Sequence, residues 1–404
     1  VLSELSTGEV QRKGRKRCSM PWRTILSKTE IRHRQMEREG RHMARIGISI
    51  YPEHTTPERD RAYMEMAAKY GCSRIFSCLL SVTKSREEIG KEFRGQIDFA
   101  HRLGMEVILD VAPVVLKRLG VTYDDLSFFS EIHADGIRLD EGFDSLAESI
   151  MTYNPQNLKI EMNASLGNRY LENIMSHCPK TANLTTCHNF YPQRYTGLGY
   201  RHFEKCSREI HKLGLPVAAF VSSQEPNAFG PWPVNDGLCT LEMHRDLPVD
   251  TAARHLFATG LVDDVLIANC YASEEELRNL SLLDPSLLTF RMEREYTLSC
   301  TEEKILYETL HFVRGDMSDF MARSTQSRVL YADQEVPARN TRDMKRGDVV
   351  IVNDEYNRYK GELQIVLMDM ENDGRKNVIG HLPANERMLL DYLGPWRKFG
   401  FIKS

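Results

Sequence analysis

Short runs of apolar and β-branched residues alternate with longer segments of helical spacing along most of the chain. Eight of these short runs are expected to be strands: RIGISIY from residue 45, SRIFSCLL from 73, MEVILDVA from 105, ADGIRLD from 134, LKIEMNA from 158, LTTCHNF from 184, LPVAAFVS from 215 and DDVLIAN from 263. Apart from a longer insertion after the seventh run, they begin about 30 residues apart, which suits one strand and one covering helix. The pattern predicts a parallel sheet covered by helices.

The predicted helices begin and end at residues with suitable local chemistry. Thr56 and Pro57 suit an N-cap and the first helical residue, and Gly71 is expected to end that helix. Ser85 and Glu88 have the spacing of a capping box at the start of the next helix.

The eight units predict an α/β fold, a TIM-like (β/α)8 barrel over residues 43–288, with its active site where the strands end. The pattern changes after Leu288. Strand-like segments there are TLSC (297–300), SRVLYA (327–332), GDVVIVN (347–353) and GELQIVLMD (361–369), while SCTEEKILYETLHFVR (299–314) has the main helical pattern. Residues 289–404 are expected to form a second, smaller and mostly β domain that could close into a small barrel.

The charge of the chain is unevenly distributed. The formal net charge is -4, yet residues 1–42 carry eleven Lys and Arg residues against five Glu residues, so the remainder is acidic. An acidic remainder argues against a nucleic-acid partner held by general electrostatic attraction. No apolar run approaches the roughly 18 residues of a membrane helix, so no membrane partner is expected.

Residues 1–42 show neither helical nor strand periodicity and are expected to be a disordered basic extension. The alternative is a natural start at Met43, because MARIGISIY opens directly into the first strand. The nine cysteines are an odd number without a CxxC pair, which favours reduced thiols and a cytoplasmic protein.

Polar residues gather at the predicted carboxyl ends of the strands. They are Glu53 and His54, Ser77 to Ser81, Asp110, Arg138 and Asp140, Asn163 and Ser165, His188 and Asn189, Ser222 and Ser223, and Asn269 and Tyr271. Carboxylates that face one pocket can divide into a proton donor and a base or nucleophile, which makes Asp110, Asp140 and Glu53 catalytic candidates. For Asp140 the alternative is a structural ion pair with Arg138.

Two long loops offer further candidates. The loop after the seventh strand carries Glu242, His244 and Arg245, which could reach over the barrel mouth or belong to a lid without chemistry. An anion needs arginine side chains and free backbone N–H groups. The segments that offer both are Arg194, Tyr195, Gly197 and Gly199 after the sixth strand, and Gly167, Asn168 and Arg169 after the fifth, with Arg245 as a further cation.

Several mechanisms lack their usual residues. No lysine lies at a predicted strand end, which disfavours a Schiff base, and neither GxGxxG nor GxxxxGK[ST] occurs, so no nucleotide cofactor is assigned. A divalent metal held by Glu53, Asp110, Asp140 and His188 is an open alternative, although their spacing gives it no specific support.

Six segments together resemble one bacterial family. They are GISIYPE (47–53), RLDEGF (138–143), MNAS (162–165), HNFYPQRYTGL (188–198), GPWPVNDGLCTLEMHR (230–245) and DVVIVNDEYNRYKGELQI (348–365). The family is the 6-phospho-N-acetylmuramidases, glycoside hydrolase family 170, formerly of unknown function. The resemblance covers about residues 43–404 and implies a TIM-like barrel followed by a cyclophilin-like β domain. Cys239 departs from it, since proline would be expected there.

The resemblance implies a cytosolic enzyme of peptidoglycan recycling that cleaves N-acetylmuramic acid 6-phosphate from N-acetylglucosamine. Its partner would be this phosphorylated amino-sugar disaccharide, without metal or cofactor. Asp140, Glu242, Glu53 and Asp110 are then the candidate catalytic residues, and the candidate substrate-binding residues are Asn163, His188, Asn189, Tyr191, Arg194, Tyr195, His244 and Arg245. Arg194 or its neighbours would bind the phosphate.

Two other functions stay open at this point. A metal-dependent isomerase or epimerase of sugar phosphates would use the same acids and would lose activity on chelation. A sensor would bind a sugar phosphate without turnover. The sequence decides neither the oligomeric state, with a homo-oligomer remaining open, nor whether hydrolysis retains or inverts configuration, because the carboxylate separation is not readable from it.

Overall fold

The computed structural model describes residues 44–79, 84–234 and 236–403. The predicted extension at 1–42, the alternative start at Met43 and the candidate Ser81 therefore lie outside the described residues. Nothing in the described region tests them.

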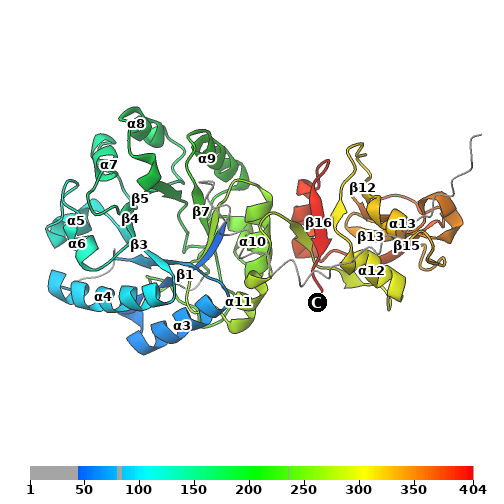
Figure 1. The fold of residues 1–404 in the computed structure, drawn as a ribbon, viewed down its shortest axis with the longest axis horizontal. Coiled ribbons are helices and arrows are strands. Elements are labelled where there is room, and N and C mark those ends of the chain that lie inside the picture. Colours follow the sequence, from blue (N-terminus) through cyan, green and yellow to red (C-terminus); the bar gives the residue numbers. More distant parts are fainter. Residues whose placement is uncertain (1–43, 80–83, 235, 404) are drawn as a thin grey trace, which may run out of the picture. The chain divides into compact units, whose positions relative to one another are not determined.

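Eight parallel strands close a barrel in chain order, and the last strand pairs with the first (Figure 1). They are β1 (Arg45–Ile50), β2 (Arg74–Cys78), β3 (Glu106–Val111), β4 (Gly136–Leu139), β5 (Lys159–Asn163), β6 (Leu184–Cys187), β7 (Val217–Val221) and β8 (Asp264–Ile267). Each strand falls within one of the eight predicted runs, so the predicted barrel class is confirmed. Most strand residues are buried, because both faces of a closed parallel sheet are covered, and the charged residues among them, such as Arg74, Arg138 and Glu161, are buried too.

The helices of the barrel lie outside the closed sheet (Figure 1). They are α3 (Pro57–Lys69), α4 (Arg86–Arg102), α5 (Pro113–Leu119), α6 (Ser127–Glu131), α7 (Leu146–Met151), α8 (Tyr170–Ser176), α9 (Tyr200–Lys212), α10 (Val249–Ala258) and α11 (Glu274–Ser281), with 3-10 turns η1 (Pro52–His54), η2 (Thr181–Asn183) and η3 (Glu242–His244). The Thr56 side chain accepts the N–H of Arg59, and Ser85 with Glu88 forms both bonds of a capping box. Gly71 has a φ of +84° where α3 ends.

The second domain holds its strands in two sheets. The five-stranded sheet has the order β10 (Glu293–Arg294), β15 (Lys376–His381), β13 (Asp348–Val352), β14 (Leu363–Val366) and β12 (Met321–Ser324), and the three-stranded sheet has the order β11 (His311–Phe312), β16 (Lys398–Phe401) and β9 (Leu288–Phe290). Its helical segments are α12 (Cys300–Glu308), α13 (Gln326–Leu330), η4 (Asp354–Tyr359) and η5 (Ala384–Tyr392). The prediction of a smaller, mostly β domain is confirmed.

Two strand predictions in this domain are wrong. TLSC is not a strand, because Ser299 caps α12 and forms a capping box with Glu302, a signal that the sequence carried. SRVLYA is mostly α13, in which Val329 and Leu330 stay exposed while Ser327 is buried. The two apolar residues of that run therefore did not mark a buried strand face.

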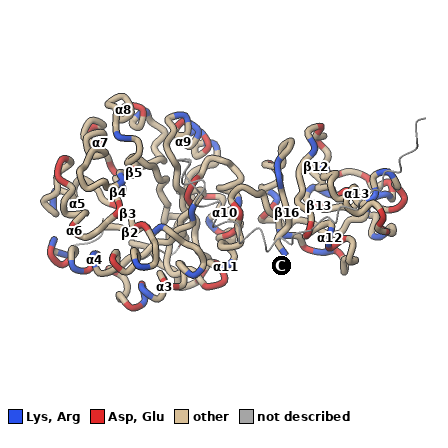
Figure 2. Tube along the Cα trace, in the orientation of Figure 1, with Lys and Arg blue, Asp and Glu red and all other residues tan. Residues whose placement is uncertain are grey.

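Acidic and basic positions are interspersed along outer helices of the barrel such as α3 and α4 (Figure 2). Within the described ranges, no helix is both long enough and apolar enough to cross a membrane.

Ion pairs that are buried around Arg74 and partly exposed around Arg45 join several barrel strands. Arg74 at the start of β2 donates from Nη1 to Asp264 at 2.7 Å and from Nη2 to Glu161. Arg45 also binds Asp264, and it reaches Glu106 at 2.6 Å. Such pairs are costly to break, because the charge left behind stays buried.

Arg74→Ala is expected to lower the free energy of unfolding by roughly 3–5 kcal/mol, because Glu161 is left buried without this guanidinium. Arg208→Ala is the control and is expected to lower the free energy of unfolding much less, since its pair with Glu204 lies on the surface and is screened by solvent. Urea unfolding of both variants measures the difference. Equal losses would show that the buried network is not a main source of barrel stability.

Candidate active site

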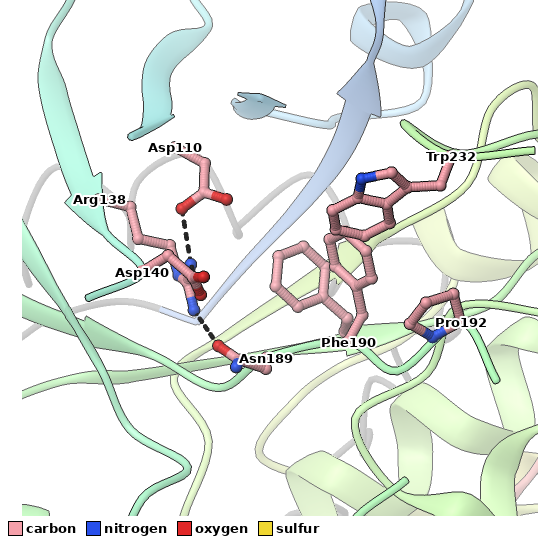
Figure 3. Close-up of a pocket in the computed structure, with 8 residues that line it drawn as sticks. Asp110, Arg138, Asp140, Asn189, Phe190, Pro192 and Trp232 are labelled. Carbon is pink, nitrogen blue, oxygen red and sulfur yellow. Dashed lines mark hydrogen bonds and ion pairs between the residues drawn. The ribbon is translucent and has the colours of Figure 1, made fainter. Parts of the chain in front are cut away.

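A cavity of about 230 Å³ opens at the carboxyl end of the barrel, on the face where a barrel of this class carries its active site. Its lining residues come from β3, β4, β7 and the segments after β4, β6 and β7, and they are Asp110, Arg138, Asp140, Asn189, Phe190, Pro192, Phe220 and Trp232. Charged and amide side chains face aromatic side chains across the cavity (Figure 3). The cavity therefore has one polar and one apolar wall.

The polar wall is organised by Arg138. Its Nη1 donates to Asp110 Oδ1 at 2.6 Å and to Asp140 Oδ1 at 3.3 Å. The first contact follows from the strand register, in which Asp110 of β3 lies opposite Arg138 of β4. Because both oxygens contact one nitrogen, they are at most about 6 Å apart, a spacing at which two carboxyl groups can act on one glycosidic bond.

Asp110 and Asp140 differ in their surroundings. Asp110 is buried, and this burial raises its pKa to about 6 even though the charge of Arg138 opposes the shift. Its second carboxylate oxygen points away from Arg138 (Figure 3). The Asp140 side chain is 35% exposed and contacts Arg138 as the predicted ion pair. Two carboxyl groups in unlike environments suit two different roles.

Asn189 completes the polar wall and is held at three points. Its Oδ1 accepts from Arg138 Nη2, its backbone N–H donates to Ser165 Oγ at 2.9 Å, and its carbonyl accepts from Thr240 Oγ1 at 2.9 Å. Asn163 supports the neighbouring segment, because its amide donates to the carbonyl of Asp140 at 3.3 Å. Asn189 therefore reaches the cavity, and Asn163 positions the backbone beside it.

His188 turns away from this cavity. Its imidazole is buried between Ser165 Oγ at 3.2 Å and Ser207 Oγ at 2.9 Å. Burial lowers its pKa to about 3, so it is neutral near pH 7. His188 thus supports the strand end, and the geometry gives no support to its predicted contact with the sugar.

The apolar wall is made by Phe190, Pro192, Phe220 and Trp232. The ring of Phe190 lies 5.0 Å from that of Phe220 and 5.8 Å from that of Trp232. Trp232 is 37% exposed at the cavity. Sequence reasoning did not assign these residues to the site, although a tryptophan between two prolines in a long barrel loop was a signal for them.

His54, in the turn after β1, contacts the residue before Trp232. His54 Nε2 is 3.0 Å from the carbonyl oxygen of Pro231, and its ring lies 6.4 Å from that of Phe229. Glu53 is the neighbour of His54 in η1, but it is not among the described residues that line the cavity. His54 therefore contacts the segment that carries Trp232, and Glu53 is not part of the cavity lining.

Glu242 joins two loops, which we call loop six (188–199) and loop seven (222–248). Its carboxylate accepts the N–H groups of Tyr195 and Gly197 at 2.8 Å each, and Arg245 donates to it from Nε and Nη2 at 2.8 and 2.7 Å. The Arg245 hydrogen bonds, followed by those backbone N–H groups, hold the pKa of Glu242 down at about 2. An ionised group with this many donors is a poor proton donor, so the geometry does not support the predicted catalytic role of Glu242.

Arg245 has no N–H group left for a phosphate. Besides Glu242, it binds the carbonyl oxygens of Tyr191, Gln193, Asp236 and Gly237 at 3.0 to 3.1 Å. We refer to Glu242 and Arg245 together as the loop clasp. The backbone N–H groups of Tyr195 and Gly197 in loop six, which were expected to bind an anion, donate instead to the carboxylate of Glu242.

Arg194 of loop six is more accessible than Arg245 of loop seven. Its guanidinium is 40% exposed and forms two hydrogen bonds with Asp246, at 2.8 and 3.0 Å. Both residues line a second, polar cavity of about 170 Å³ that also includes Ser222, Ser223 and Asn269. Tyr195 is 84% exposed beside Arg194.

The remaining predicted residues lie deeper in the loops. Tyr191 is half-buried, and its backbone pairs with Cys239 of loop seven. His244 is fully buried and bonds His255 at 2.7 Å. In the described ranges no three His, Cys, Asp or Glu side chains form a group that could hold a metal ion, so Glu53, Asp110, Asp140 and His188 do not form the alternative metal site.

Comparisons with known proteins match this architecture. A family model described as 6-phospho-N-acetylmuramidase, N-terminal, matches residues 46–282, and its C-terminal counterpart matches residues 288–402. No curated protein matches the chain. Among solved structures, an uncharacterized B. cereus protein is 49% identical with a TM-score of 0.83, covering 89% of this chain and 100% of that one.

A conserved Enterococcus faecalis protein with an unknown function shares the fold at 24% identity and a TM-score of 0.68, covering 89% of this chain and 97% of that one. The two family models between them span both domains, as the resemblance of the six segments predicted. The chain therefore belongs to the 6-phospho-N-acetylmuramidase family of glycoside hydrolases.

Proposed function

We propose that this protein hydrolyses the glycosidic bond between N-acetylmuramic acid 6-phosphate and N-acetylglucosamine. The observation that carries the proposal is the cavity in which Asp110 and Asp140 share the Arg138 guanidinium opposite an aromatic wall. Family membership supports the choice of a phosphorylated muramic substrate. Because a sugar phosphate is an intracellular metabolite, we place the reaction in the cytoplasm, in the recycling of peptidoglycan fragments.

Asp110 is the proposed proton donor. Its pKa of about 6 leaves roughly a tenth of the molecules protonated at pH 7, and these carry the acid form that a leaving oxygen requires. Asp140 is the proposed nucleophile, because it is more exposed to the cavity and Arg138 stabilises its negative charge. The two oxygens at most about 6 Å apart fit a reaction through a covalent intermediate better than one that needs a water between them.

The proposed reaction has two steps. First, Asp140 Oδ attacks the anomeric carbon, the bond to the leaving oxygen breaks, and Asp110 transfers its proton to that oxygen. Second, a water oxygen attacks the same carbon, Asp110 takes up the water proton, and the carboxylate of Asp140 leaves. Arg138 binds both carboxylates and positions them through both steps.

The apolar wall would bind a face of the sugar ring. Trp232 and Phe190 present ring surfaces to the cavity, and the C–H face of a pyranose packs on such surfaces while its hydroxyl groups reach polar partners. Asn189 supplies an amide on the opposite wall. The division into two walls therefore suits a carbohydrate.

Arg194 is the proposed phosphate ligand. Its ion pair with Asp246 lies at the surface, where solvent screens such pairs and they add little to stability, so exchanging Asp246 for a dianion costs little. Arg245 is less suited, because each of its donors is already used in the loop clasp.

Incubation with the phosphorylated disaccharide tests the activity. Products are followed by mass spectrometry beside the unphosphorylated disaccharide, with and without EDTA. Cleavage of the phosphorylated compound that survives EDTA is expected. A folded protein that cleaves neither compound would contradict the proposal, and activity lost on chelation would favour a metal-dependent enzyme instead.

Asp110→Asn is expected to lower kcat roughly 10²- to 10⁴-fold, the usual contribution of a general acid. In the native protein, kcat/KM should decline as pH rises through about 6, because Asp110 then loses the proton that the reaction needs. Asp124→Asn, which changes an exposed carboxylate in the turn between α5 and α6, is the control and should leave the profile unchanged. An unaltered decline in the Asp110 variant would assign the proton donor elsewhere.

Arg194→Ala is expected to weaken binding of the phosphorylated disaccharide about tenfold, since a charged hydrogen bond is lost. The unphosphorylated disaccharide should bind as before, because it lacks the dianion. Calorimetric dissociation constants for both compounds provide the comparison, with the exposed Arg201→Ala as the matched variant. An equal loss for both compounds would mean that Arg194 does not contact the phosphate.

A further inference from the structure

Loops six and seven, which carry most of the apolar wall, are paired with each other. Leu198 N–H donates to the carbonyl of Thr240 at 2.8 Å, and Glu242 N–H donates to that of Leu198 at 3.1 Å. The loop clasp adds side-chain bonds from η3 to the backbone of loop six. The position of the wall therefore depends on where η3 is held.

One residue of η3 is anchored to α10. His244 lies between Glu242 and Arg245 of the clasp, and its Nε2 is 2.7 Å from Nδ1 of His255. Both imidazoles are buried, and burial lowers the pKa of His255 to about 4. Both rings are thus neutral near pH 7, and each nitrogen in this contact is either a donor or an acceptor.

The second domain supplies the other partner of His255. Tyr392, the last residue of η5, has its hydroxyl 3.0 Å from His255 Nε2, and the same hydroxyl donates to Tyr200 Oη at 2.9 Å. Tyr200 begins α9 directly after loop six. One hydroxyl of the β domain therefore contacts both the anchor of loop seven and the end of loop six.

The hydrogen bonds that link Tyr200, Tyr392, His255 and His244 have a single consistent set of donors and acceptors. Because Tyr392 uses its only proton toward Tyr200, it must accept from Nε2–H of His255. His255 Nδ1 then accepts from Nε2–H of His244. Removing the Tyr392 hydroxyl would leave a buried N–H without this acceptor and release the tautomer that orients His244.

We propose that Tyr392 of the β domain is a positioning residue for the active site, acting through His255, His244 and the loop clasp on the wall that contains Trp232. The β domain is thereby a part of the catalytic unit. This inference concerns the site of the proposed function, and its kinetic consequences rest on that function.

A second set of contacts keeps η5 beside α10. Arg254 of α10 donates to both carboxylate oxygens of Glu386 in η5 and contacts Asp250, and all three side chains are buried. Arg291 joins the same group. These ion pairs hold the two elements together independently of Tyr392, so loss of one hydroxyl should leave the domains docked.

Fluorescence of Trp232 tests the proposal without any substrate. The chain has three tryptophans, and the substitutions Trp22→Phe and Trp396→Phe leave Trp232 as the single indole. In this background Tyr392→Phe is expected to raise acrylamide quenching of Trp232 about twofold, as the wall becomes mobile. Tyr296→Phe is the matched control, since its hydroxyl bonds Glu302 within the β domain. Unchanged quenching in a folded Tyr392 variant would overturn the proposal.

A double-mutant cycle tests the kinetic consequence. Tyr392→Phe is expected to raise KM about fivefold in the native protein and less than about twofold when Trp232→Ala has removed the wall, because the effect passes through that side chain. Additive effects would overturn the proposed route. If the phosphorylated disaccharide is not a substrate, the quenching result still decides whether Tyr392 positions the wall.

Discussion

The contact of one guanidinium with two carboxylates is the constraint on which the site depends. Arg138 lies opposite Asp110 in the barrel register and two residues before Asp140, so a single side chain fixes both acids. Burial alone would favour neutral carboxyl groups, and the cation opposes that tendency. Asp110 keeps a raised pKa because its desolvation outweighs the attraction, whereas Asp140 opens toward the cavity. Two similar residues thereby acquire different chemistry.

The same types of residue serve a structural purpose a short distance away. Glu242 and Arg245 form an ion pair too, but backbone N–H and carbonyl groups of the loops use their remaining capacity. This clasp adds side-chain hydrogen bonds to the isolated backbone bridges that pair the two loops. A carboxylate near a barrel mouth can therefore be assigned a catalytic role only when its hydrogen-bond donors are known, since these donors decide whether it can exchange a proton.

Local patterns predicted much of the fold. The β-branched runs and the caps at Thr56 and Ser85 depend on neighbours in the chain, which the sequence displays. Asp110 and Asp140 were identifiable because strand ends in a barrel point to one face. Of their two ion pairs with Arg138, only the one with Asp140 was predictable from the sequence. The contact of Asp110 with Arg138 depends on the register of two neighbouring strands. The role of His188 depends on serines from distant segments and could not be inferred locally. Glu242 has one local partner, Arg245 three residues away, but the N–H groups of loop six that occupy the rest of its carboxylate come from a distant segment.

The central claim is that Asp110 and Asp140, held by one arginine, act on one glycosidic bond through a covalent intermediate. The most direct measurement is proton NMR of the sugar released first from the phosphorylated disaccharide, recorded before mutarotation. Asp110 Oδ1 and Asp140 Oδ1 are at most about 6 Å apart, because both contact Arg138 Nη1. This spacing predicts that the new hemiacetal has the anomeric configuration of the substrate. Release of the opposite anomer would contradict the account, because inversion requires carboxyl groups far enough apart to hold a water between them.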